Sequence, residues 1–155
     1  MTTEENYSGT EEQLVAFKLG REEYGISILQ VQEIKRMTDI TRVPHTPDYL
    51  RGVINLRGSV LPVIDLKARL NLAAQDYSED TRIIIVKIDE ISVGMIVDAV
   101  SEVMAIPQEN IEPPQISTGA VDANYISGVG KLENRLVILL NLEAIIGNNQ
   151  EGKAS

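Results

Sequence analysis

The sequence predicts a mainly β protein made of two small barrels packed against each other, and two observations carry that prediction. The first is an internal duplication, since residues 49–70 align without a gap on residues 125–146 when shifted by 76 positions. The second is a series of short apolar runs separated by turns that contain glycine or proline, a pattern typical of sandwiches and small barrels. The identical pairs of the duplicated stretch are Tyr49/Tyr125, Gly52/Gly128, Val53/Val129, Leu56/Leu132, Leu66/Leu142 and Ala68/Ala144.

The first ordered segment reads as a β-hairpin followed by a helical turn. Residues 14–19 and 24–28 are apolar runs on either side of Gly20-Arg21-Glu22-Glu23, which predicts two antiparallel strands. The apolar residues that follow recur at helical rather than alternating spacing, which predicts a short helix or helical turn. They are Leu29, Val31, Ile34 and Met37.

The middle of the first half predicts a second hairpin with a short helix at its end. Residues 39–48 contain two prolines and cannot be regular helix, so we expect an extended connection there. Strands are predicted at about 53–56 and 59–64, around a turn that holds Arg57 and Gly58. Asp65 is placed to cap a short helix over residues 66–70.

The first half is repeated after a polar loop over residues 71–80. Shifted by 69 positions, residues 14–34 align on residues 83–103, with Lys18/Lys87, Gly25/Gly94, Val31/Val100 and Glu33/Glu102 identical. The offset then grows from 69 to 76, so seven extra residues must lie between the two repeated segments of the second half. We place them in residues 107–122, where Pro113 and Pro114 favour an extended loop.

These elements predict one domain over residues 13–146, made of halves at about 13–72 and 81–146. A lone half of this size buries too little surface to be more than marginally stable, so the halves must share apolar surface. An exchange of strands between them is compatible with the sequence. Residues 1–12 and 147–155 are polar, and we expect flexible tails.

The composition narrows the class of function. There is no cysteine among the 155 residues, which excludes disulfides, thiolate metal sites and cysteine nucleophiles. A net charge of −9 argues against a nucleic-acid binder, which needs a clustered basic surface. No run approaches the ~18 apolar residues of a membrane span, so we expect a soluble, cytoplasmic protein.

The sequence offers little for catalysis. His45 is the one histidine; it stands between two loop residues, Pro44 and Thr46, without a nucleophile to activate or a second zinc ligand. Neither a Gly-x-Ser-x-Gly elbow nor a phosphate loop occurs. We therefore expect no enzyme activity, no metal and no cofactor.

Two features suggest contacts rather than chemistry. Arg57 lies at the tip of the predicted hairpin, where its guanidinium can either brace a nearby acid such as Glu33 or bind a partner's carboxylate, and the sequence leaves both open. Val31 and Val100 are equivalent positions of the two halves. Each is core-like by itself, but as a pair they can line a groove between the barrels, where amphipathic helices dock.

Four short motifs together resemble the CheW-like family of bacterial chemotaxis coupling proteins. They are Glu23-Tyr24-Gly25-Ile26, Val31-Gln32-Glu33-Ile34, the segment GVINLRG at residues 52–58 and the segment LPVIDL at residues 61–66. The resemblance extends from Gln13 to Ile146. Related modules end the chemotaxis histidine kinase and, fused to a receiver domain, form the CheV adaptors; this chain has no room for either addition.

The resemblance implies two five-stranded SH3-like barrels and a non-catalytic adaptor. Such proteins connect the cytoplasmic tips of chemoreceptors to the regulatory domain of the kinase, without nucleic acid or membrane insertion. We expect a monomer in solution that is recruited to membrane-associated receptor arrays. By motif, the resemblance implies that Val31, Glu33 and Arg57 take part in receptor and kinase coupling. We add Ile28 and Val100 to Val31 and Glu33 as receptor-binding residues, because they flank the expected groove between the barrels. For the kinase we expect a face on the first barrel formed by Val43, Pro44 and Arg57.

Two other functions compete with this interpretation. A generic SH3-like module would bind a proline-rich peptide, but the chain has no tryptophan, one phenylalanine and five tyrosines, too few for an aromatic-lined groove. A CheV-type adaptor that lacks its receiver domain is the second alternative. The loop around His45 differs from many relatives, so its residues carry over poorly from the family.

Overall fold

The computed structural model describes residues 10–114 and 121–147, which form eleven strands and a few short helices. The first half contains β1 (Glu11–Leu19), β2 (Glu22–Ser27), the 3-10 turn η1 (Ile28–Gln30), β3 (Val31–Arg36), β4 (Leu50–Leu56), β5 (Ser59–Asp65) and helix α2 (Leu66–Arg69). The second half contains β6 (Arg82–Ile88), β7 (Ile91–Val97), β8 (Ala99–Pro107), η2 (Gln108–Asn110), β9 (Ile111–Glu112), η3 (Ala123–Tyr125), β10 (Ile126–Leu132) and β11 (Arg135–Leu140). Residues 142–147 are helical.

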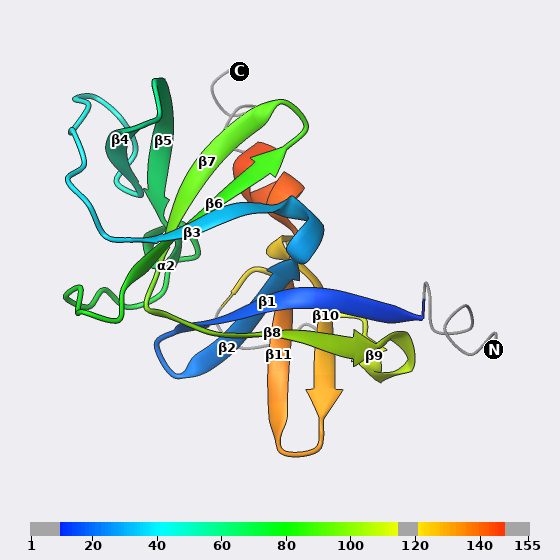
Figure 1. Ribbon diagram of the computed structural model, residues 1–155. Coiled ribbons are helices and arrows are strands. Elements are labelled where there is room, and N and C mark those ends of the chain that lie inside the picture. The colour runs from blue at the N-terminus through cyan, green and yellow to red at the C-terminus, as the bar shows by residue number, and fades with distance from the viewer. Residues whose placement is uncertain (1–9, 115–120, 148–155) are drawn as a thin grey trace.

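Each sheet contains strands from both halves of the duplicated sequence (Figure 1). The first barrel has the strand order β3-β6-β7-β5-β4, and the second has the order β8-β1-β2-β11-β10-β9. The N-terminal hairpin β1–β2 thus belongs to the second barrel, where β2 pairs in parallel with β11, while β6–β7 joins the first through a parallel pair with β5. The predicted fold class, mainly β with two SH3-like barrels, is confirmed; none of the described helices is long and apolar enough to cross a membrane.

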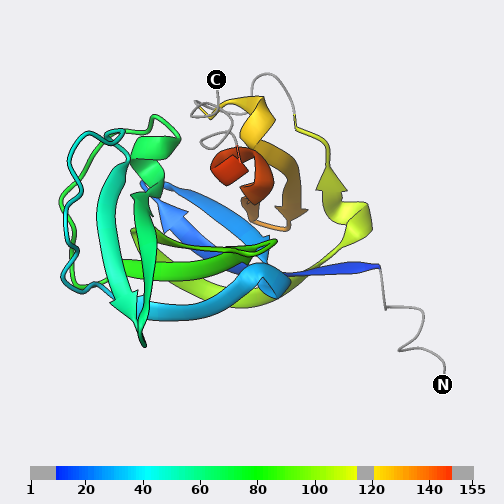
Figure 2. The ribbon, with the colours of Figure 1, turned by 90° about the horizontal axis from the view of Figure 1, so that it is seen from above.

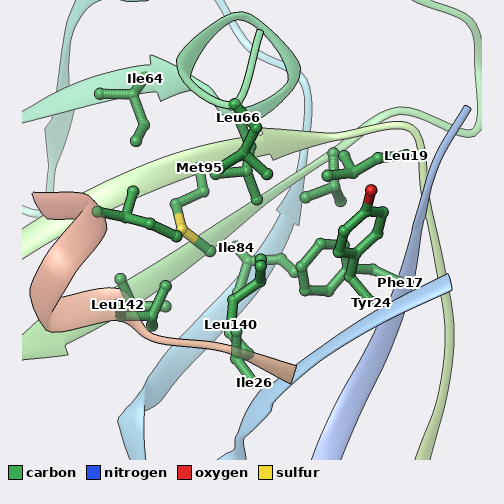
Figure 3. Close-up of a cluster of buried hydrophobic side chains, with 14 of the residues drawn as sticks. Phe17, Leu19, Tyr24, Ile26, Ile64, Leu66, Ile84, Met95, Leu140 and Leu142 are labelled. Carbon is green, nitrogen blue, oxygen red and sulfur yellow. The ribbon is translucent and has the colours of Figure 1, made fainter. Parts of the chain in front are cut away.

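The largest apolar core lies between the two sheets rather than inside either one. Figure 3 shows Phe17, Tyr24 and Ile26 of the second barrel facing Ile84 and Met95 of the first, all of them buried. Strand β6 alternates its side chains, so that its odd-numbered isoleucines fill the first barrel while the others enter this shared core. Burial of each large apolar side chain contributes about 1.5 to 3 kcal/mol, so most of the stabilisation requires both halves together.

The two copies of the duplicated stretch have matching helix caps. Asp65 accepts a hydrogen bond from the amide of Ala68 at 3.3 Å, and Asn141, its equivalent, accepts one from Ala144 at 3.1 Å. The amides of both cap residues also donate to the carbonyls of the equivalent tyrosines Tyr49 and Tyr125, each at 2.8 Å. The predicted hairpins and the predicted cap at Asp65 are therefore present.

Helix α2 and the helix of residues 142–147 can be followed in Figure 2, and the side chain of Arg69 joins them through hydrogen bonds to Ile145. The guanidinium of Arg69 at the end of α2 lies 4.8 Å from the ring centre of Tyr49 and 5.1 Å from that of Tyr125. It also donates two hydrogen bonds, at 3.0 and 2.8 Å, to the carbonyl of Ile145, the equivalent of Arg69 itself. Cation–π contacts and hydrogen bonds thus connect the barrels near their axis of internal symmetry.

The helical turn expected after the first hairpin is present, but it ends sooner than the spacing of the apolar residues indicated. Only residues 28–30 are helical, and β3 follows at once, paired antiparallel with β6. Along β3 the exposure alternates with a period of two, because one face lies against the molecule and the other faces solvent. The few apolar residues at helical spacing were too short a run to distinguish a helix from a strand.

Two of the expected boundaries also look different in the structure. Strand β1 begins at Glu11 and so includes the last two residues of the segment expected to be an N-terminal tail. These two residues, Glu11 and Glu12, pair with Pro107 and Ile106 of β8. Residues 107–122, where we placed the extra residues of the second half, contain η2 and β9. The rest of that insertion, at 115–120, and the tail residues 1–9 and 148–155 lie outside the described residues.

Candidate functional site

The turn between β4 and β5 presents Arg57 to solvent beside an acid of β3. Arg57 has a φ of 50° and Gly58 a φ of 89°, and the side chain of Asn55 accepts a hydrogen bond from the Gly58 amide at 2.9 Å. The Arg57 Nη2 atom donates to Glu33 Oε1 at 2.6 Å, although the Arg57 side chain stays 72 % exposed. The brace to Glu33 is therefore present, and it leaves much of the guanidinium accessible.

The ion pair influences the titration of both groups. The hydrogen bond from Arg57 lowers the pKa of Glu33 below its ordinary value, and the bond to Glu33 raises the pKa of Arg57 further. Glu33 is thus a carboxylate at neutral pH. Because the pair is exposed, a partner's carboxylate can compete for Arg57 without a large loss of fold stability.

The proposed receptor-binding apolar residues lie on the segments that cross between the barrels. Val31 begins β3 and pairs with Val86 of β6, and Val100 lies on β8 opposite Phe17 of β1. Ile28 precedes Val31 in η1. All three are partly buried and pack against the shared core, so the structure brings them to the seam of the two barrels.

The two other proposed kinase-binding residues lie in the connection between β3 and β4. Val43 and Pro44 are exposed and line a shallow pocket of about 370 Å³ together with Arg42, His45 and Arg51. The lining of that pocket does not include Arg57. The structure therefore places Val43 and Pro44 together, on the same barrel as Arg57 but in a different place.

Sequence reasoning missed a set of exposed apolar residues that the duplication relates in pairs. Ile34 and Val103 are equivalent at an offset of 69 and are 40 % and 58 % exposed. Val60 and Leu136 are equivalent at an offset of 76 and are 66 % and 56 % exposed. An apolar residue at the same outward position of both halves was the available signal.

These features define a scaffold protein with two SH3-like barrels and exposed contact surfaces. Within residues 10–114 and 121–147, no three His, Cys, Asp or Glu side chains are grouped in a way that would hold a metal ion. What the described surface offers is an exposed arginine, a seam lined by apolar side chains and single exposed apolar residues at equivalent positions of the two halves.

Comparisons with known proteins identify the family of this scaffold. The model of the CheW-like domain matches residues 13–150. The chemotaxis protein CheW of Klebsiella aerogenes is 37% identical over 139 residues, which are 90% of this chain and 84% of that protein. The crystal structure of the scaffolding protein TtCheW from Thermoanaerobacter tengcongensis matches with a TM-score of 0.82 and 40% identity, over 86% of this chain and 91% of the other.

The chain therefore belongs to the CheW-like family, and the expected function as a chemotaxis coupling adaptor is confirmed at the level of that family. The chemotaxis protein CheV3 of Helicobacter pylori is a more distant relative. It is 28% identical over 136 residues, and the match covers 44% of its length.

Proposed function

We propose that this chain is a non-catalytic adaptor that binds chemoreceptor tips through the seam of the barrels and the kinase regulatory domain through the first barrel. One observation carries the proposal: each barrel contributes a crossing strand with a partly buried valine at the seam, while Arg57 stands exposed on the first barrel beside the partly buried Glu33. A surface formed by both barrels can make contacts that depend on how the two helices of a bound receptor tip are arranged.

The receptor face consists of Ile28, Val31, Glu33 and Val100. A chemoreceptor tip is a helical hairpin, and an amphipathic helix binds by laying its apolar stripe on partly exposed apolar side chains. Val31 and Val100 supply such side chains from opposite barrels. Glu33, two residues beyond Val31 on β3, adds a carboxylate that is charged at neutral pH.

The kinase face consists of Val43, Pro44 and Arg57, which lie in the two connections that flank β4 of the first barrel. Arg57 keeps donors free besides its bond to Glu33, and a guanidinium fork binds a carboxylate with two parallel hydrogen bonds. The exposed Val43 and Pro44 add apolar contact on the same barrel. A monomer of this kind is cytoplasmic and reaches the receptor array through its two partners.

Such an adaptor transmits a signal if its contacts differ in free energy between the receptor states. A coupling free energy of about 1 to 3 kcal/mol changes a partner's equilibrium by about 5- to 150-fold. Because Val31 and Val100 also pack against the shared core, a shift of a bound receptor helix reaches both barrels.

Binding measurements with the purified chain test the two faces separately. Titration with a chemoreceptor cytoplasmic fragment, and separately with the kinase regulatory domain, is compared for the wild type, Val31→Asp and Arg57→Ala. Val31→Asp is expected to lose the receptor and keep the kinase, and Arg57→Ala to weaken the kinase. Val60→Asp is the matched control, since Val60 is an exposed valine outside both faces.

Circular dichroism spectra confirm that each variant is folded before binding is scored. A folded Val31→Asp protein that binds the receptor fragment like the wild type would contradict the assignment of the receptor face. A wild-type protein that is folded but binds neither partner would contradict the adaptor function itself.

A further inference from the structure

The surface beside helix α2 of the first barrel is covered by the loop that follows this helix. Asp65 accepts a hydrogen bond from the Tyr77 hydroxyl at 2.8 Å and one from Arg51 Nη2 at 3.3 Å. The Arg51 Nε atom also donates to the Tyr77 oxygen at 3.4 Å. An aromatic side chain from residues 71–81 thus lies over the cap of α2.

A buried ion pair closes the same side of the first barrel. The Lys67 ammonium, with a side chain only 6% exposed, lies 3.1 Å from the carboxylate of Asp98 and 2.9 Å from the Gln75 amide oxygen. Asp98 also accepts a hydrogen bond from the Gly20 amide at 2.6 Å. The loop, the helix and the crossing segment before β8 are thus held together by opposite charges.

The equivalent surface of the second barrel has different chemistry. By the offset of 76, Ser127, Asn141 and Glu143 stand where the first barrel has Arg51, Asp65 and Lys67. By the offset of 69, Leu29 stands where it has Asp98. The second barrel thus has Glu143 in place of Lys67 and Leu29 in place of Asp98. The same ion pair cannot form there.

This surface is a groove of about 460 Å³, which we call the second-barrel groove. Buried side chains of Leu14, Leu139 and Leu140 contribute to its lining, and Leu29 beside them is 92% exposed. Within the described residues no segment covers it as Tyr77 covers its counterpart. An exposed leucine beside an apolar floor gains burial when a ligand docks.

The charged residues that line the second-barrel groove have one sign. Glu12 and Glu143 belong to the lining, and no basic residue of the described chain does. Each glutamate receives a described hydrogen bond from a neutral amide, Gln108 to Glu12 at 2.8 Å and Gln30 to Glu143 at 3.4 Å. The groove therefore favours a ligand that brings positive charge.

We propose that the second-barrel groove docks a segment of a partner protein that carries a lysine or arginine next to an aromatic or aliphatic side chain. The first barrel shows the arrangement within one chain, where Tyr77 and basic side chains meet Asp65 and Asp98. In the second barrel Asn141 and Leu29 stand in place of these two acids, Glu12 and Glu143 are the acids that line the groove, and the basic donor comes from outside. This inference does not depend on the receptor and kinase faces proposed above.

Amide chemical shifts of the isotopically labelled full chain test the proposal. The probe is a synthetic peptide of residues 70–81, the segment that covers the equivalent surface, with the substitutions D76K, E79K and D80K; the unsubstituted peptide is the control. The basic peptide is expected to bind about tenfold more tightly than the acidic one, since three charges are reversed. Its binding should shift the amides of Leu29, Ser127 and Asn141.

Variants with matched controls locate the site. Leu29→Ala is expected to weaken the basic peptide about tenfold, as burial of a leucine side chain predicts. Glu143→Lys should weaken it about fivefold. The controls Leu136→Ala and Glu133→Lys change an exposed leucine and a glutamate at the far end of β11 and should leave binding unchanged.

Three outcomes would overturn the proposal. They are shifts that cluster away from the groove, equal binding of the two peptides, and a control variant that weakens binding as much as its counterpart. Lys153→Glu, in the full chain without peptide, examines whether the chain's own C-terminal segment fills the groove. If this variant shifts Leu29, Ser127 and Asn141, the occupant is the chain itself and the partner proposal fails.

Discussion

In each barrel an equivalent glutamate forms an ion pair with an arginine, but the two arginines stand at different positions of the duplicated sequence. Glu33 and Glu102 are equivalent by the duplication, yet Glu33 binds Arg57 at the hairpin tip while Glu102 binds Arg135, two positions further along the equivalent hairpin. Arg135 also forms a two-pronged pair with Glu23, with distances of 3.0 and 2.7 Å, and its side chain is 36 % exposed. Arg57 has one carboxylate and twice the exposed fraction.

This difference separates an arginine that holds the fold from one that is available to a partner. Arg135 connects β11 to β2 and β8 and so ties the exchanged hairpin to the second barrel. Arg57 braces a single strand and keeps free donors. A duplicated scaffold can thus keep one copy of a motif for stability and leave the other open for recognition. The predictions that follow test this contrast, from the largest expected effect to the smallest.

Gly52→Ala should be far more damaging than the equivalent change Gly128→Ala. Gly52 has a φ of 147°, and an added Cβ would lie 2.1 Å from the Thr41 carbonyl oxygen, where the chain pairs with Val53 to close the first barrel. We expect a loss of about 3 kcal/mol or more in the free energy of unfolding. At Gly128 the nearest atoms are an Ile111 methyl carbon at 2.9 Å and the Glu112 carbonyl oxygen at 3.1 Å, and φ is not in the left-handed region, so the loss should be smaller.

Urea denaturation of both alanine variants measures this difference. Equal losses at the two glycines would show that closure of the first barrel at Thr41 has no special importance for stability.

Lys67→Met should destabilise the protein by about 2 kcal/mol, because it leaves the Asp98 carboxylate without its buried cation. The estimate is below that for a fully buried pair, since the Asp98 side chain is 29 % exposed. Glu143→Met at the equivalent position should have almost no effect, because Glu143 is exposed. Thermal unfolding of both variants measures the difference; a neutral Lys67→Met would mean that the ion pair is dispensable.

Arg135→Ala should cost about 1 to 2 kcal/mol in the free energy of unfolding, because two carboxylates lose a shared, charge-assisted partner. Arg57→Ala should cost less, since it removes one exposed pair. In binding the order should be reversed, with Arg57→Ala weakening the kinase domain and Arg135→Ala leaving it unchanged. Denaturation and titration of the same two variants measure both orders, and a larger loss of stability in Arg57→Ala would refute the contrast.

The smallest expected effect is the pH dependence of the Glu33–Arg57 pair. The pKa of Glu33 is lowered in the folded protein, so its contribution to stability is present above the ordinary value of 4.5 and disappears as the pH falls through the lowered folded pKa. Wild type and Glu33→Gln should therefore differ slightly in urea midpoint at pH 7 and converge at low pH. A difference that persists at pH 3 would show that the charge of Glu33 is not its cause.

Local signals in the sequence predicted much of the fold. The repeated tyrosine, glycine and cap residues predicted both hairpins and the helix after Asp65, because turns and caps depend on a few neighbouring residues. After β2 the expected helical turn covers only residues 28–30, and residues 31–36 form the strand β3, because pairing with β6 outweighed a weak spacing pattern. The sequence did not predict which barrel contains the hairpin β1–β2 and which contains β6–β7, since the two hairpins are equally apolar.

The candidate site was predictable to a smaller extent. The tip position of Arg57 followed from the predicted hairpin, and its brace to Glu33 was one of the two contacts that the sequence left open. The exposed pairs Ile34/Val103 and Val60/Leu136 were missed, because an apolar residue in a strand looks alike whether it points inward or outward. Assignment of the receptor and kinase faces stays a prediction that depends on the binding measurements.

The position of the N-terminal hairpin has a consequence for synthesis of the chain. The first barrel is continuous, from β3 to β7, and is complete in sequence once residue 97 has left the ribosome. The hairpin β1–β2 emerges first, yet its parallel neighbour β11 ends at residue 140, so its edge waits for nearly the whole chain. Such long-range pairing slows folding and leaves an open strand edge during translation. When several chains are synthesised close to one another, exchange of hairpins between two molecules would begin at that edge.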